Sequence, residues 1–167
     1  VAKMSKVMGK RKAFIWSQSI SIIGYISLLF LFVPGKPYLF LFALPFISFG
    51  IGSLCTLMMS MTSDVIDIDE LNTGKRREGI FGAIYWWMVK LGQGLALVLG
   101  GLVLKVVGFD QNVSIQSAST ITNLRLADII IPVVTAALAI WVMWNYDLSE
   151  DKAKEIKAEL INRRGEL

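Results

Sequence analysis

The sequence has 167 residues, of which 54% are hydrophobic, and its mean hydropathy is +0.59. It contains no histidine, so imidazole proton relays, histidine-bound metals and Ser-His catalytic triads are excluded within this chain. Its single cysteine, Cys55, excludes an internal disulfide and is interpreted as a small packing residue. The net charge of +4 comes from basic residues that flank long apolar segments, a pattern typical of membrane topology and not of nucleic-acid binding.

Four apolar segments dominate the chain. They comprise residues 13–33, 38–62, 79–106 and 126–146. Each is long enough to cross a hydrocarbon core, which takes roughly 20 apolar residues of helix, whereas apolar runs of about 10–14 residues are more typical of buried core helices. The sequence therefore predicts an all-α, polytopic membrane protein with four transmembrane helices.

Polar segments separate these four spans and indicate their orientation. The first twelve residues hold five Lys or Arg and no acidic residue, and basic side chains recur in the middle polar segment and in the tail. Lys and Arg concentrate in cytoplasmic loops, so both ends and the middle segment are expected in the cytoplasm. The predicted polar segments are a cytoplasmic basic segment (1–12), a cytoplasmic loop (63–78), an external loop (107–125) and a cytoplasmic tail helix (147–167).

Lys90 is the most informative residue of the third span. It lies 11 residues after Gly79, which is about 16 Å along a helix and close to the middle of the membrane. A lysine at this depth costs roughly 2.5–3.5 kcal/mol on insertion scales, so it is expected to face a cavity or a carboxylate. No carboxylate of the other spans can serve, because Asp128 lies near the outer end of the fourth. The missing partner predicts that more protein completes this site.

The helical period predicts which residues surround Lys90. Trp86 and Trp87 lie one turn before it and Gln93 lies one turn after it, so together they are candidates for a substrate or cation pathway. For the two tryptophans, packing or lipid contact is an equally good interpretation. The glycines of this span are better explained as close contacts between helices.

The first two spans contain many small and hydroxylated residues, which are typical contacts between membrane helices. Pro45, Gly50 and Gly52 are candidates for a bend or a loosened segment in the second span, as transporters use in gating.

The polar segment after the second span begins with carboxylates, including Asp64 and Asp67. Its glycine and final glutamate have the wrong spacing for an EF-hand calcium loop. We interpret it as a solvated loop in which the acidic residues pair with nearby charged residues, namely Lys75, Arg76, Arg77 and Glu78. No phosphate loop, nucleophile elbow or zinc motif is present, so neither an enzyme nor a resident metal or cofactor is predicted.

Several short motifs occur in an order that resembles one transporter family. They are residues 9–12 (Gly-Lys-Arg-Lys), 63–67 (Ser-Asp-Val-Ile-Asp), 73–79 (Thr-Gly-Lys-Arg-Arg-Glu-Gly), 90–93 (Lys-Leu-Gly-Gln), 124–125 (Leu-Arg), Pro132 at the opening of the last span, and 146–148 (Tyr-Asp-Leu). The chain is similar to the glycoside–pentoside–hexuronide:cation symporters, the melibiose-permease-like branch of the major facilitator superfamily. The first residues, Val-Ala-Lys, also read as the interior of a longer chain.

The resemblance implies that the four spans correspond to helices nine to twelve of a twelve-helix fold. It implies symport of a sugar or glycoside with Na⁺ or H⁺ by alternating access across the cell inner membrane. Lys90 would lie near carboxylates of the missing N-terminal helices. These helices would also supply most of the groups that bind the coupling cation. Asp64 and Arg76, with the adjoining Asp67 and Glu78, would form cytoplasmic contacts between the two halves. The solute stays open, because some members have a small hydroxylated residue where Trp86 stands.

Two other functions are compatible with four spans. A complete four-helix exporter requires a carboxylate near mid-membrane, which this sequence lacks. A stand-alone scaffold or assembly subunit would require a natural product of this size and a stable partner. The implied partners of the leading hypothesis are the bilayer, the missing helices and a sugar-like solute, with no nucleic acid.

Overall fold

The computed structural model describes residues 1–33, 35–146, 148 and 150–165, without the side chains of residues 151 and 164. Its elements follow one another in the order α1 (Ala2–Met8), α2 (Lys10–Leu31), η1 (Pro37–Phe42), α3 (Leu44–Thr73), α4 (Glu78–Val106), α5 (Ala118–Trp144) and α6 (Glu150–Gly165). Four of these, namely α2, α3 with its preceding turn η1, α4 and α5, are long and apolar enough to cross a membrane. The predicted all-α membrane fold is confirmed.

The helices extend beyond the apolar segments. α2 begins at Lys10, and α3 continues through the polar residues to Thr73, so the expected loop at 63–78 is mostly helix. α3 ends at Gly74, whose φ of 66° is the left-handed conformation that favours glycine as a helix stop. α5 begins at Ala118 instead of residue 126, because the Ser117 side chain accepts a hydrogen bond from the Thr120 N–H and caps the helix. Hydropathy marks where the membrane ends, whereas capping residues mark where a helix ends.

Two prolines occupy positions that the sequence analysis did not assign correctly. Pro45 lies in the first turn of α3, where its missing N–H and fixed φ are favourable, so it starts this helix and does not interrupt it. Pro132 lies inside α5 and does not open the last span, because the helix already began at Ala118. One turn later, the Thr135 hydroxyl donates to the carbonyls of Ile131 and Pro132, each at 3.0 Å.

α2 packs against both α3 and α5 and is the centre of the bundle. At its crossing with α3 the backbones approach closely, and a Cβ added to Gly50 would lie 2.3 Å from the Cβ of Ser21. The buried Gln18 amide donates to the Gly50 carbonyl at 3.0 Å. The buried polar residues of this crossing are Ser17, Gln18, Ser21 and Ser53. The prediction that small and polar residues join the first two spans is confirmed for these positions.

Two arginines tie the antiparallel helices α2 and α5 together at both ends. Arg11, near the start of α2, donates to the carbonyls of Trp144 and Tyr146 at the end of α5. Arg125, near the start of α5, donates to the carbonyls of Leu28 and Leu29 at the end of α2. Each cation therefore lies at the negative end of the other helix dipole, where it is favourable.

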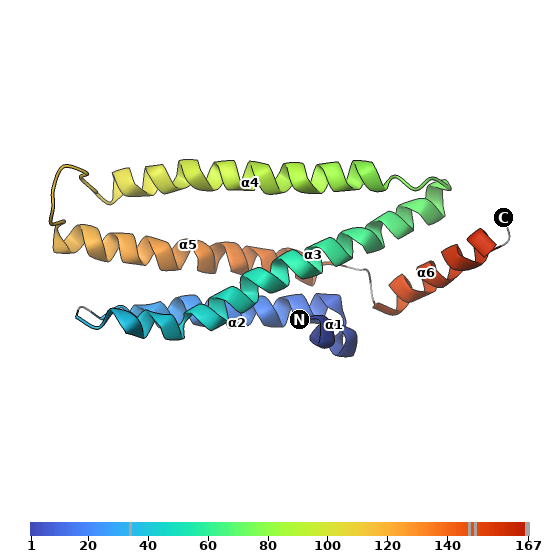
Figure 1. The fold of residues 1–167 in the computed structure, drawn as a ribbon, viewed down its shortest axis with the longest axis horizontal. Helices are drawn as coiled ribbons and strands as arrows, with labels where there is room; N and C mark the ends of the chain where they lie inside the picture. Colours follow the sequence, from blue (N-terminus) through green and yellow to red (C-terminus); the bar gives the residue numbers. More distant parts are fainter. Residues whose placement is uncertain (34, 147, 149, 166–167) are drawn as a thin grey trace.

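The remaining helices lie at the margins of this bundle (Figure 1). α4 contributes no buried residue. α1 and α6 lie at the same end of the molecule as the α3–α4 connection, whereas the turn after α2 and the α4–α5 loop lie at the opposite end. The described part of the predicted tail helix is α6, which buries Ile156 and Leu160 but leaves Ile161 61% exposed. Arg163 fastens it to α3 through the Leu71 carbonyl, at 3.3 Å.

Candidate transport site

Lys90 lies on an open face of α4. Its ammonium donates to the side-chain oxygen of Gln93, one turn further along, at 3.3 Å. No ion pair of Lys90 occurs among the residues that the structure describes. The structure thus brings Lys90 and Gln93 together and leaves the lysine charge without a carboxylate in this part of the chain.

The two tryptophans before Lys90 are also exposed. Trp86 is 54% exposed and packs edge-on against Tyr85, with ring centroids 5.5 Å apart, and Trp87 is 64% exposed. Tyr85 did not feature in the sequence analysis, although an aromatic residue next to the Trp pair was visible there. α4 buries none of its described residues, so the predicted pathway residues lie on a helix that the described part of the chain leaves largely exposed.

Asp64 forms an ion pair that the sequence analysis missed. The Lys10 ammonium contacts both carboxylate oxygens of Asp64, at 2.7 and 2.6 Å, and also donates to the Ser60 carbonyl at 3.3 Å. The two side chains are only 23% and 16% exposed. Lys10 had been interpreted through topology alone, and its position before the first span gave no signal of a partner 54 residues away.

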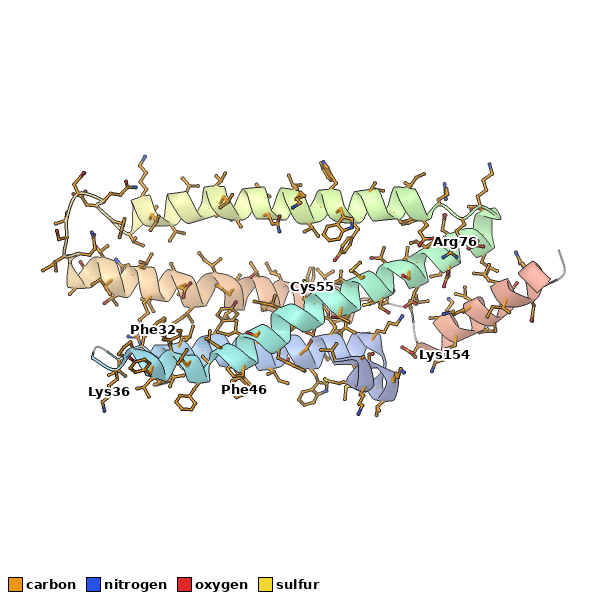
Figure 2. All side chains as sticks on the ribbon, in the orientation of Figure 1. Phe32, Lys36, Phe46, Cys55, Arg76 and Lys154 are labelled. Carbon is orange, nitrogen blue, oxygen red and sulfur yellow. The ribbon has the colours of Figure 1, made fainter. Side chains whose placement is uncertain are left out.

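The other predicted contact residues, Asp67, Arg76 and Glu78, lie at or near the short α3–α4 connection, where Figure 2 places Arg76. Arg76 contacts the carboxylates of Asp67, Glu70 and Glu78, at 3.7, 3.0 and 3.0 Å. Hydrogen bonds to Glu78 and Glu70 raise the pKa of the Arg76 guanidinium above its ordinary value. The predicted self-pairing of this segment is therefore observed, although Asp67 and Glu70 lie on the last turns of α3 and Glu78 lies on the first turn of α4, and not in a loop.

Arg77 pairs with Asp69 across the same connection, with its Nε donating to a carboxylate oxygen at 2.8 Å. This hydrogen bond raises the pKa of the Arg77 guanidinium. Because the guanidinium groups of Arg76 and Arg77 are exposed, water competes for them and the pairs can exchange at little cost. Such contacts suit a surface whose partners change.

A cavity of about 200 Å³ lies beside the Lys10–Asp64 pair, where α2 begins and the chain passes from α5 to α6. Arg11 and Lys12 line it as well, next to Tyr146, whose hydroxyl is buried without a hydrogen-bond partner in the described part of the chain. Asp147, part of a motif that the sequence analysis used, lies outside the described residues.

Comparison with known proteins gives the context of these groups. Residues 1–150 match the family described as MFS/sugar transport protein. The chain is 31% identical to the uncharacterized symporter YnaJ of Bacillus subtilis (strain 168), over 98% of this chain and 35% of that protein. It is 28% identical to the glucuronide carrier protein homolog of Escherichia coli (strain K12), over 94% and 34%. It is 30% identical to the sodium-dependent lysophosphatidylcholine symporter 1-A of Danio rerio, over 62% and 20%.

The chain spans about a third of the length of the first two of these relatives. The match covers every helix that is long enough to cross a membrane, together with the charged α3–α4 connection and Lys90. The resemblance noted from the motifs is therefore confirmed, and the chain belongs to the MFS/sugar transport family, within the glycoside–pentoside–hexuronide:cation symporters.

Proposed function

We propose that this chain forms the C-terminal part of a symporter that moves a sugar or glycoside together with Na⁺ or H⁺ across the cell membrane. The observation that carries the proposal is the hydrogen bond of Lys90, which the sequence places near mid-membrane, to Gln93 on an exposed face of α4. An intramembrane cation is costly unless a carboxylate, a polar solute or water compensates it. The proposed partners are carboxylates on the N-terminal helices of the same transporter.

The chemistry around Lys90 suits a hydroxylated solute. The ammonium and the Gln93 amide can donate to hydroxyl or carboxylate oxygens, and the amide oxygen can accept. The exposed rings of Trp86 and Trp87 offer broad apolar faces for the C–H faces of a sugar ring. The relative named as a glucuronide carrier supports a glycoside, and the relative named as sodium-dependent supports Na⁺ as the coupling ion.

Alternating access would then use the charged end of the bundle, with both chain ends in the cytoplasm. When the two halves close on that side, Asp64, Asp67 and Arg76 would exchange their present partners for charges of the other half. Exposed pairs such as those of Arg76 suit this exchange because neither state holds them strongly.

The decisive experiment replaces Lys90 with glutamine in the full-length protein reconstituted into vesicles. We expect Na⁺- or H⁺-driven uptake of a labelled phenyl glucuronide, or of the neutral phenyl glucoside, to fall by at least about tenfold, since one lost charge contact to a bound or reacting group is worth about 1.4 kcal/mol or more. Lys105→Gln is the matched control, because Lys105 is an exposed lysine in the last turn of the same helix. Unchanged uptake by Lys90→Gln would remove Lys90 from the pathway.

Two measurements identify the coupling ion and separate solute binding from coupling. Uptake driven by a Na⁺ gradient at equal pH is compared with uptake driven by a pH gradient without Na⁺. Solute exchange without any gradient then separates solute binding from coupling. Uptake that follows neither gradient would contradict symport. A natural protein whose N-terminus lies near Val1 would favour a four-helix subunit instead.

A further inference from the structure

A second cavity opens on the surface of the bundle where α2 begins and α5 ends. Its volume is about 360 Å³, and it is lined by Arg11, Lys12, Ile15, Trp16 and Trp144. Two of these side chains are cationic, two are indoles and one is aliphatic, and none of the described residues that line it is acidic. It therefore combines positive charge with apolar surface in one place.

The position of these side chains follows from the two helices. Lys12 and Trp16 are one turn apart on α2 and share a face, with Ile15 beside them. Trp144 is the last residue of α5. Trp16 and Trp144 are 59% and 62% exposed, as expected for tryptophans at the boundary between headgroups and hydrocarbon. This pattern favours a position of the cavity at the membrane interface, with its cations near the start of α2.

Neither cation of the cavity, Arg11 or Lys12, forms an ion pair among the residues that the structure describes. Lys10, the first basic residue of this run, pairs with Asp64 and lies outside the cavity lining. Arg11 donates to two backbone carbonyls at the end of α5, which fix its guanidinium in place without cancelling its charge. A guanidinium has five N–H donors, so others remain for a ligand. Lys12 is exposed.

We propose that this cavity binds the headgroup of an anionic phospholipid. The phosphate would lie between Arg11 and Lys12, and the glycerol and upper acyl chain would lie along Ile15 and the two indoles. Guanidinium and ammonium groups are strong phosphate donors, and basic pockets between membrane helices on the cytoplasmic side bind anionic headgroups. The inference is independent of the transported solute, because α2 and α5 supply every described residue that lines the cavity, whereas Lys90 lies on α4.

The test compares two brominated lipids as quenchers of tryptophan fluorescence in the full-length protein. Vesicles contain either brominated phosphatidylglycerol, which is anionic, or brominated phosphatidylcholine, which has no net charge. We expect quenching to show a preference for phosphatidylglycerol of about fivefold for each contributing cation, the preference given by one basic residue near a membrane surface. Replacing Trp16 and Trp144 with phenylalanine should remove the preferential part of the quenching.

Lys12→Gln should lower the preference for phosphatidylglycerol about fivefold, since it removes one of the two cations. Lys6→Gln is the matched control, because Lys6 is a basic residue of α1 that does not line the cavity. Lys12 is exposed, so its replacement should not unfold the protein, and an unchanged thermal midpoint checks this.

Three results would overturn the proposal. Equal quenching by the two lipids would show that the cavity does not select anionic headgroups. An equal loss in the Lys12 and Lys6 variants would show only a general attraction of basic residues to the surface. Removal of the preference by millimolar inorganic phosphate would assign the cavity to free anions and not to lipid.

Discussion

α3 and α4 are consecutive helices of nearly equal length, 30 and 29 residues, and each contains a long apolar stretch with at least two glycines. They differ in what they bury. α3 places Gly50, Ser53, Leu57, Met61 and Ile66 in the interior of the bundle, whereas α4 buries none of its residues. Hydropathy alone does not separate the two helices. The contrast shows that α3 is matched to surfaces within this chain and α4 is not.

The glycines show the difference most clearly. A Cβ on Gly50 would collide with Ser21, and a Cβ on Gly24 would lie 2.8 Å from the Cβ of Phe46. A Cβ on any of several α4 glycines would meet no described atom within 4 Å, namely at Gly82, Gly92, Gly94, Gly100 and Gly101. Small residues permit close approach of membrane helices. Gly24 of α2 and Gly50 of α3 already use it, whereas the α4 glycines leave open space next to them in the described part of the chain.

The largest effect is expected from Gly50→Val. The added side chain would force α2 and α3 apart, and overpacking of this kind costs typically about 1–3 kcal/mol. Gly94→Val is the matched control on α4, with no described neighbour at its Cβ position. Thermal unfolding of residues 1–167 in detergent should show a clear loss for Gly50→Val only. In the full-length protein, we expect Gly94→Val to become destabilising too, and equal behaviour of the two variants in the short chain would contradict the contrast.

Arg125→Gln should have the next largest effect. It removes the cation that bonds the last carbonyls of α2 and lies 5.5 Å from the centre of the Phe32 ring. A cation at a partly buried helix C-terminus stabilises by up to about 2 kcal/mol. A lower thermal midpoint is expected, with Lys36→Gln as the control at the same end of the bundle. If both variants unfold at the wild-type temperature, the Arg125 contacts do not stabilise the α2–α5 pair.

The four helices that are long and apolar enough to cross a membrane could be predicted because they depend on a local quantity, the length of an apolar segment. The contacts between residues of different helices could not be predicted. The Lys10–Asp64 pair joins residues 54 apart, and the contact of Gly50 with Ser21 depends on how two helices cross. Neither arrangement follows from periodicity within one helix. The helical continuation of α3 to Thr73 was missed because polarity was taken as the end of the helix, whereas Gly74 ends it.

Gln18→Leu should have a smaller effect. It removes the buried hydrogen bond to the Gly50 carbonyl, and such bonds between membrane helices contribute about 0.6 kcal/mol on average. Gln93→Leu, on the exposed face of α4, should leave the stability of the short chain unchanged, because its only described hydrogen bond is with Lys90. In the short chain, Gln18→Leu should therefore lower stability more than Gln93→Leu does. In the full-length protein, Gln93→Leu should lower uptake more than Gln18→Leu does. A Gln93 variant with normal uptake would separate this residue from the proposed site.

Arg77→Gln should change stability least. Its guanidinium binds Asp69 across the α3–α4 connection, but this guanidinium is exposed and water competes for it, so unfolding temperatures of variant and wild type should agree at physiological salt. The more enclosed Lys10–Asp64 pair provides the matched comparison, and Asp64→Asn should lower the midpoint measurably because Lys10 then loses its carboxylate inside the bundle end. If Arg77→Gln proves the more damaging of the two, the connection between α3 and α4 is a structural tie and not the exchangeable surface that alternating access requires.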